Sequence, residues 1–241
     1  MANGYILYEG KSSIDGAPIV VVATGFKAVS TNRKTGAVIQ TYILRSDIDP
    51  QTAVKSGDDA SICGVCPHRG DGTGKERSCY VNLGWGPRSV YAAYKNGKYP
   101  AVTIEEMPDL FAGKVVRLGS YGEPVAAPIE MWEAVTSKAD SHLGYTHRFR
   151  DVSPDWAKLC MASADSVQDM DEAHALGYRT FRVAPVGEGP IKGREVVCPA
   201  SEEAGKKTTC EDCRACGGTS AKAKISIQIA AHGTGKKYVD A

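Results

Sequence analysis

The chain has 241 residues, with 29 lysines and arginines against 28 aspartates and glutamates and a formal net charge of +1 at pH 7. This length can bury a substantial core and fits one domain of barrel size. The near-neutral charge gives no whole-chain argument for binding nucleic acid, and no apolar run is long enough to cross a bilayer, so we expect no membrane partner.

The first expected elements are strands. The short β-type runs Tyr5–Tyr8 and Ile19–Val22 are separated by the turn signal Asp15-Gly16 and predict a hairpin. Val38–Leu44 is rich in β-branched and aromatic residues and mostly apolar, as a strand covered on both faces should be. A polar segment and a cysteine-rich loop follow it. A helix is then expected at Arg88–Lys95, just after a proline.

Strands and helices alternate along the rest of the chain. We expect strands at Val115–Leu118, Tyr145–Phe149, Lys158–Ala162, Tyr178–Val183, Glu195–Val197 and Ile225–Ala230, and helices at Ile129–Lys138 and Ser166–Leu176. This alternation implies βα units and a parallel sheet. The predicted fold class is α/β, a full or partial (β/α) barrel of about six or seven parallel strands. Residues 1–36 would form an N-terminal β-hairpin extension, and residues 37–241 a single barrel-like domain.

Eight cysteines are the most informative residues of the chain. The N-terminus MANGYILYEG lacks the basic start and apolar run of a secretory signal, so we expect a cytoplasmic protein. Cys-x2-Cys pairs in such a protein are more often metal ligands than disulfides. Cys160 stands alone in an apolar strand and is interpreted as a small buried hydrophobe.

The other seven cysteines form two groups. Cys63, Cys66 and Cys79 lie in the loop 61–80, and three thiolates leave one coordination position open. The C-terminal cysteine-rich loop, 198–216, holds four thiols, which close a coordination shell: Cys198, Cys210, Cys213 and Cys216. Closed sites are typically structural and open ones catalytic, so the first group is expected to be reactive and the second structural or auxiliary. His68, between the thiols of the first group, is an alternative fourth ligand that would close that site.

In a parallel barrel the chemistry lies at the carboxyl ends of the strands. Polar residues follow the predicted strands at these places: Gly122-Glu123-Pro124, His147 and Arg148, Ser163 and Asp165, Arg182, and His232. We assign catalytic roles to His147, Arg148 and His232. For His147 the alternative is a core histidine bonded to a backbone carbonyl, and for Asp165 it is a helix cap.

The cysteine triad after the first barrel strand and the Gly-Glu-Pro after the second resemble the radical S-adenosylmethionine (SAM) enzymes, whose GGEP motif contacts the methionine amino group. Here the motif reads Tyr121-Gly122-Glu123-Pro124, and the cysteine spacing is C-x2-C-x12-C where the familiar one is C-x3-C-x2-C. The motifs CPHRG, CYVN, CPAS and TCxxCxxC, with a late His-Gly, are also similar to a family of uncharacterised bacteriophage and plasmid proteins. That second likeness spans most of the chain and implies the cytoplasm of a bacterial host.

The radical SAM resemblance implies a [4Fe–4S] cluster on the three cysteines, with one iron free to bind the amino and carboxylate groups of SAM. It also implies an auxiliary cluster on the other four cysteines, an external electron donor and a small-molecule or nucleotide substrate. Gly122, Glu123 and Pro124 would lie at the cofactor, with Glu123 receiving the methionine ammonium and Arg182 or Arg148 pairing with the carboxylate.

A second interpretation is a zinc protein in which both cysteine groups are structural. Cys-x2-Cys pairs favour zinc, because zinc is the metal that such pairs most often bind in proteins. The function would then be binding, for example to nucleic acid through local basic stretches such as Lys206-Lys207, without catalytic activity. The sequence favours the enzyme, because its ligands lie in loops of a large predicted barrel and not in a small self-contained module.

Overall fold

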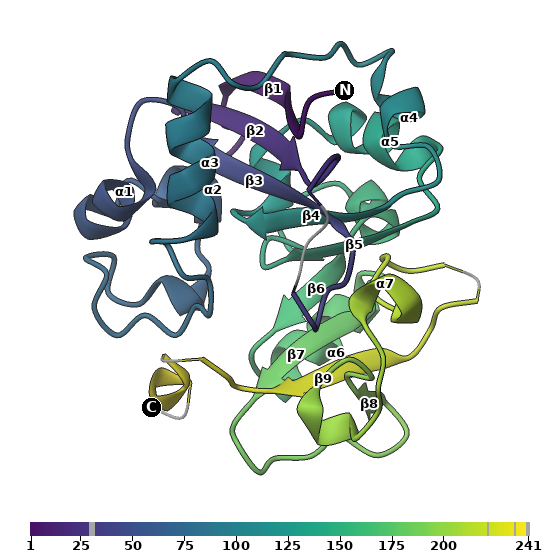
Figure 1. The fold of residues 1–241 in the computed structure, drawn as a ribbon. Helices are drawn as coiled ribbons and strands as arrows, with labels where there is room; N and C mark the ends of the chain where they lie inside the picture. Colours follow the sequence, from purple (N-terminus) through teal and green to yellow (C-terminus); the bar gives the residue numbers. More distant parts are fainter. Residues whose placement is uncertain (29–31, 221, 234, 240–241) are drawn as a thin grey trace.

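A nine-stranded sheet runs through the computed structural model, which describes residues 1–28, 32–220, 222–233 and 235–239 (Figure 1). The strands are β1 (Gly4–Lys11), β2 (Pro18–Thr24), β3 (Ile39–Arg45), β4 (Val115–Tyr121), β5 (Ser141–Thr146), β6 (Met161–Ala164), β7 (Thr180–Ala184), β8 (Glu195–Val197) and β9 (Ser226–Ala230). Their order in the sheet is β1-β2-β3-β4-β5-β6-β7-β9-β8. β1, β2 and β3 pair antiparallel, and every pairing from β3 onward is parallel.

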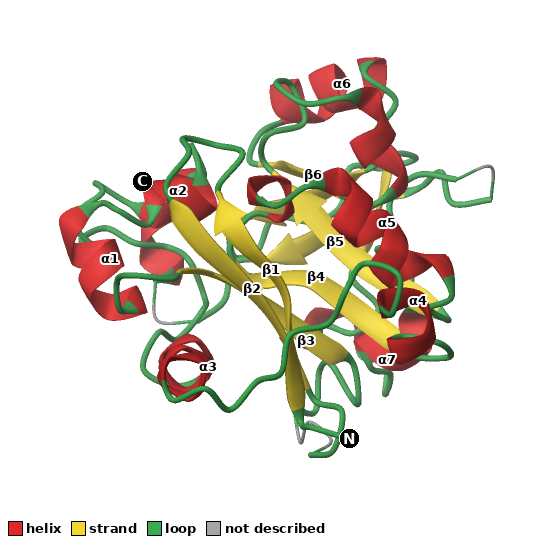
Figure 2. Cartoon of the chain, turned by 90° about the horizontal axis from the view of Figure 1, so that it is seen from above, coloured by secondary structure: helices red, strands yellow, loops and turns green. Residues whose placement is uncertain are grey.

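The helices lie in the connections between strands. They are α1 (Pro50–Ser56), α2 (Ala60–Cys63), α3 (Gly86–Lys95), α4 (Met107–Leu110), α5 (Ile129–Ser137), α6 (Val167–Ala175) and α7 (Cys210–Cys213). Figure 2 shows α1 and α3 on one side of the molecule and α5 and α6 on the other. No helix in the described part of the chain is long and apolar enough to span a membrane.

The two faces of the parallel strands have different roles, because successive side chains of a strand point to opposite faces. On β4, Val116 and Leu118 pack in the main core with Trp132 of α5. Val115, from the opposite face, belongs to a second apolar cluster that also contains Leu143, Ile227 and the cysteines Cys198 and Cys216. The second cysteine group is therefore part of the packing on one face of the sheet.

The sheet is mixed α/β and mostly parallel, as the sequence predicts, but it is an open sheet with β1 and β8 at its edges. A closed barrel is not found among the described strands, and the sheet is larger than the six or seven strands expected. The reason is the predicted hairpin, β1 and β2, which joins the sheet through the pairing of β2 with β3. The hairpin residues Ile19–Ala23 are fully buried in the main core.

Several boundaries differ from the sequence expectation. The strand expected at Tyr145–Phe149 is β5, and it ends at Thr146. It contains Gly144, where a Cβ atom would lie 2.5 Å from the carbonyl oxygen of Leu159, so this glycine allows close packing within a strand. The strand expected from Lys158 begins at Met161, because residues Pro154–Lys158 form a 3-10 turn.

The polar segment between β3 and the cysteine loop, for which the sequence predicts no helix, contains α1. Asp49 caps this helix by accepting a hydrogen bond from the Gln51 backbone N–H at 2.9 Å, Pro50 occupies the first turn, and Gly57 ends the helix with a φ of 83°. α1 leads directly into α2, whose last residue is Cys63.

Candidate functional site

A cavity of about 450 Å³ lies on the face of the sheet that carries the second apolar cluster. Its floor consists of alternate residues of the parallel strands, among them Arg117, Leu143, Tyr145, Phe181, Val183, Ile227 and Ile229. All seven grouped cysteines line it: Cys63, Cys66, Cys79, Cys198, Cys210, Cys213 and Cys216. Two groups that are more than a hundred residues apart in the chain therefore face one common space.

The first cysteine group is held by the loop that follows α2. The Cys79 backbone N–H donates to the His68 carbonyl at 3.0 Å, which returns the loop to its start. Arg69 donates to Asp59 at 2.6 Å and to the Gly57 carbonyl at 3.0 Å. Burial raises the pKa of the Cys63 thiol well above its usual value, and the neighbouring thiols of Cys66 and Cys79 raise it further. The three thiols are thus electrostatic neighbours in a half-buried loop.

The second cysteine group surrounds Cys216. Burial raises the pKa of Cys216 to about 12, with further contributions from Cys198, Cys210 and Cys213. Each of these thiols is near the others, although 17 residues lie between Cys198 and Cys216 in the sequence.

Arg179 fixes the end of this loop, a role that the sequence does not reveal. Its side chain is buried, and it donates from Nε to the Gly218 carbonyl at 2.8 Å, from Nη2 to the Ala215 carbonyl at 2.8 Å and from Nη1 to the Ile225 carbonyl at 3.0 Å. These bonds satisfy loop carbonyls that would otherwise be buried without donors.

Arg117 of β4 lies between the two cysteine groups. Its guanidinium carbon is 5.7 Å from the centroid of the Tyr80 ring and 5.8 Å from that of Tyr145. Its positive charge opposes the burial that raises the pKa of Cys79 and that of Cys210. Arg117 donates from Nη2 to the Tyr80 hydroxyl, its Nε is buried without a hydrogen-bond partner, and it makes no ion pair with any described carboxylate. The sequence analysis missed this residue, although a single arginine on the same face as Val115 in an otherwise apolar strand is a signal.

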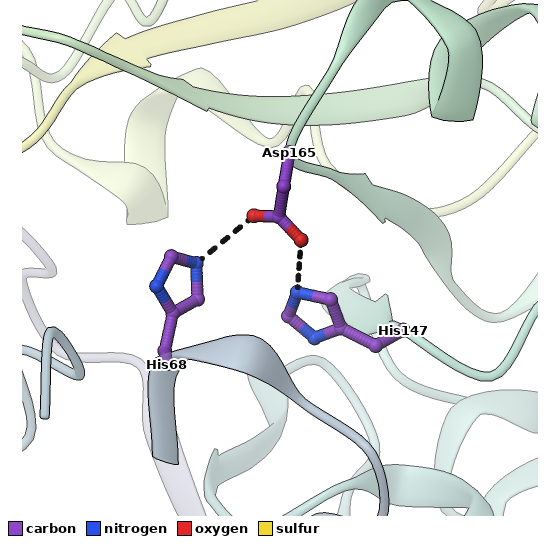
Figure 3. A group of neighbouring side chains, drawn as sticks. All are labelled: His68, His147 and Asp165. Carbon is purple, nitrogen blue, oxygen red and sulfur yellow. Dashed lines mark ion pairs between the residues drawn. The ribbon is translucent and has the colours of Figure 1, made fainter. Parts of the chain in front are cut away.

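His68, His147 and Asp165 come together at the cavity wall (Figure 3). His68 Nε2 lies 3.1 Å from one carboxylate oxygen of Asp165, and His147 Nε2 lies 3.2 Å from the other. The pKa of Asp165 is lowered, because the two histidines outweigh the effect of burial. The pKa of His147 is raised well above its usual value, because Cys66 and Asp165 outweigh burial. His68 therefore faces Asp165, and not a fourth position among the three thiols.

Glu123 connects the second predicted motif to this wall. Gly122 has a φ of +88°, and a Cβ atom there would lie 2.7 Å from that of Ile43, so the turn requires glycine. The next residue, Glu123, is 6% exposed and accepts a hydrogen bond from the His147 backbone N–H at 3.0 Å. Its other oxygen, Oε1, is buried without a hydrogen-bond partner, and burial raises the pKa of the carboxyl.

The remaining predicted residues divide into two sets. His232 lines the cavity, and its ring centroid is 5.3 Å from that of Tyr80. Arg182, Arg148 and Pro124 are not among the described residues that line it. Arg182 pairs with the buried Glu195 at 2.8 Å, and Arg148 lies 3.6 Å from Asp151. Pro124 accepts a hydrogen bond at its carbonyl from the Trp132 ring.

The resemblance to radical SAM enzymes and that to phage and plasmid proteins depend on the quoted motifs alone. No protein-family model matches this chain, and no curated protein or solved structure matches it.

Proposed function

We propose that this protein is a radical SAM-like iron–sulfur enzyme with two metal centres on one cavity. Cys63, Cys66 and Cys79 would hold the reactive [4Fe–4S] cluster with an open iron. The four thiols of the segment 198–216 would hold a second, auxiliary centre. The observation that carries the proposal is that three thiols and four thiols line the same cavity of about 450 Å³, which is a usual size for a small-molecule site.

The sulfur atoms of the described cysteines do not lie at the spacing of ligands around one zinc ion. A tetrahedral zinc ion with sulfur ligands at about 2.3 Å brings those sulfur atoms to roughly 3.8 Å from one another. Among the described residues, no three cysteine sulfur atoms lie within 4.8 Å of one another. Thiolates that bind different irons of one cluster stand farther apart than thiolates on one ion. The arrangement of the thiols therefore favours neither metal, and the choice of a cluster depends on the group of three cysteines, which leaves one position open.

The charge of Arg117, at the cavity, also fits an anionic iron–sulfur cluster. An iron–sulfur cluster with thiolate ligands is an anion, and Arg117 is a cation without a carboxylate partner in the described chain, placed near both Cys79 and Cys210. The same guanidinium can pair with the carboxylate of an amino acid ligand, a role that we first assigned to Arg182 or Arg148. Arg182 is occupied by Glu195 and Glu188, so Arg117 is the better candidate.

Glu123 supports the recognition of an ammonium group. Its Oε1 is buried without a hydrogen-bond partner and belongs to a residue that lines the cavity. A buried carboxyl in this state gains most from a ligand that brings a positive charge and N–H donors. When bound, the cluster would supply the electron that cleaves SAM, taken from an external electron donor. The chain's own residues would hold the amino acid part of SAM between Glu123 and Arg117.

Anaerobic preparation with measured iron, sulfide and zinc contents tests this proposal. We expect iron and sulfide, and an electron paramagnetic resonance signal of the reduced protein that changes when SAM is added. Replacing Cys63, Cys66 or Cys79 by alanine should abolish that change and leave the iron of the second group in place. Cys160→Ala is the matched control, because this buried cysteine belongs to neither group.

Zinc in place of iron, with no response to SAM, would contradict the proposal. The two cysteine groups would then be structural, and binding partners such as nucleic acid would be the next class to test.

A further inference from the structure

We propose that His68, His147 and Asp165 form a binding site for one divalent first-row transition-metal ion, separate from both cysteine groups. This is the one set of three histidine, cysteine or acidic side chains in the described chain whose ligand atoms all lie within 4.8 Å of one another. The inference does not depend on the iron–sulfur proposal, because none of its three ligands is a cysteine.

The distances are those that a shared ion produces. Nitrogen and oxygen ligands lie about 2.1 Å from such an ion. At the angles of octahedral or tetrahedral coordination, two such ligands are roughly 3.0 to 3.4 Å apart. The two nitrogen–oxygen distances in the group are 3.1 Å and 3.2 Å.

The same three groups form charge contacts when the rings are protonated. The buried Nε2 of His147 lies 3.2 Å from one Asp165 oxygen, and Nε2 of His68 lies 3.1 Å from the other. A divalent ion would take the place of the ring protons, because each neutral ring offers its Nε2 lone pair while the carboxylate keeps its charge.

The group also has the outer support that metal-binding histidines usually have. His68 contacts the hydroxyl of Ser78 through its other nitrogen, Nδ1, at 2.7 Å. Such a bond fixes the ring and leaves Nε2 for the ion. Ser78 and His68 belong to the same cysteine loop, whereas Asp165 follows β6 and His147 follows β5. An ion would therefore tie the first cysteine loop to the ends of two strands.

Two imidazoles and one carboxylate are a donor set for Mn²⁺, Fe²⁺ or Zn²⁺, and they leave coordination positions open. All three side chains line the cavity, so those positions are available to water or to an anionic group of a substrate. The expected ligand is a divalent cation, and the expected role is to bind a substrate oxygen beside the cysteine centres.

Mn²⁺ is the probe for the test, because it prefers nitrogen and oxygen donors and competes poorly for thiolates. The free ion is counted from its room-temperature paramagnetic resonance signal while it is titrated into the full-length protein, prepared with whatever metal its cysteines hold. We expect one additional bound Mn²⁺ per chain. Asp165→Asn and His147→Gln should each weaken this binding at least tenfold.

Two further variants keep the result interpretable. His174→Gln removes a histidine that lies outside the cavity lining and should bind Mn²⁺ as the unmodified protein does. Ser78→Ala leaves all three ligands in place and should weaken binding by a smaller factor than Asp165→Asn. Equal Mn²⁺ binding by the unmodified protein and by Asp165→Asn, with both folded by circular dichroism, would overturn the inference. So would the absence of any bound Mn²⁺ at millimolar concentration in protein whose iron or zinc content is unchanged.

Discussion

The guanidinium carbon of Arg117 lies 5.8 Å from the centroid of the Tyr145 ring, and the hydroxyl of Tyr145 contacts the thiol of Cys216. The aromatic face stabilises the cation, and the cation in turn lies close to both cysteine groups. A positive charge in this place favours any centre that becomes more negative when it is reduced.

If the cysteines hold iron–sulfur centres as proposed, Arg117→Met should therefore make those centres harder to reduce. We expect their midpoint potentials to move to more negative values, while Arg117→Lys, which keeps the charge, should restore most of the difference. A potentiometric titration followed by electron paramagnetic resonance measures this. Arg194→Met, which removes an arginine paired with Asp171 outside the cavity, is the control. An unchanged potential in Arg117→Met would argue against a cluster near this residue.

Removing the charge of Glu195 should destabilise the protein strongly. Glu195 has 0% side-chain exposure and pairs with Arg182, which has 4%, at 2.8 Å. Glu195→Gln leaves a buried guanidinium without its main partner, and such losses cost about 3 to 5 kcal/mol of unfolding free energy. The exposed pair of Lys138 and Asp109 offers the comparison, since Asp109→Asn should cost less than about 1 kcal/mol.

Urea denaturation of both variants gives the two free energies. The double substitution Arg182→Met with Glu195→Met should be more stable than Glu195→Gln, because it buries no lone charge. If the double variant is the less stable of the two, the attraction between Arg182 and Glu195 stabilises the protein by more than the free energy needed to remove the two charges from water.

Gly122→Ala should be more destabilising than an alanine at another glycine with positive φ. Gly177 has a φ of +84° and nothing within 4 Å of an added Cβ, so Gly177→Ala isolates the left-handed strain of about 1 kcal/mol. At Gly122 the same strain is combined with the close approach to Ile43, which adds about 1 to 3 kcal/mol. Thermal or urea unfolding of the two variants tests the difference. Equal losses would mean that the Ile43 strand shifts to make room.

His174 should make the protein less stable in mild acid. Burial and the charge of Arg194 lower its pKa, against the smaller opposing effects of Asp171 and Glu195, and its Nε2 contacts the Ser226 hydroxyl at 3.0 Å. Because the unfolded chain takes up this proton more readily, the stabilisation is complete above about pH 6.5 and declines as the pH falls below that value. His174→Gln should reduce the decline of the urea midpoint between pH 7.5 and 5.5. If the urea midpoint of His174→Gln falls with pH as steeply as that of the unmodified protein, other groups cause the acid sensitivity.

The sequence predicts strands and their order along the chain better than it predicts the shape of the sheet. β8 was predicted at its observed bounds, because three β-type residues between polar turns admit few alternatives. The strand expected at Tyr145–Phe149 overlaps β5 only at Tyr145 and Thr146, and the neighbouring carbonyl of Leu159 shows why a glycine, Gly144, lies inside the observed strand. Closure of a barrel depends on which strands pair at the edges, and no local pattern encodes that pairing.

Part of the candidate site is likewise visible in the sequence, and part is visible only in the structure. The cysteine groups and the turn at Gly122 and Glu123 were visible from spacing. Arg117 and the meeting of His68 with Asp165 were not, because they depend on contacts between residues 97 positions apart or on the face a strand residue occupies. The alternative in which His68 is a fourth ligand of the first cysteine group differs from the structure for this reason, since His68 lies beside the carboxylate of Asp165, which follows β6.

The segment after β9 lies against the first cysteine loop, with His232 beside Tyr80 and Gly235 against the backbone of Arg77 and Ser78. His232 and Val239 form part of the cavity wall. During synthesis, all seven grouped cysteines leave the ribosome before this segment does. The wall formed by His232 and Val239 is therefore the last part of the cavity to be made, after all seven grouped cysteines are already part of the chain.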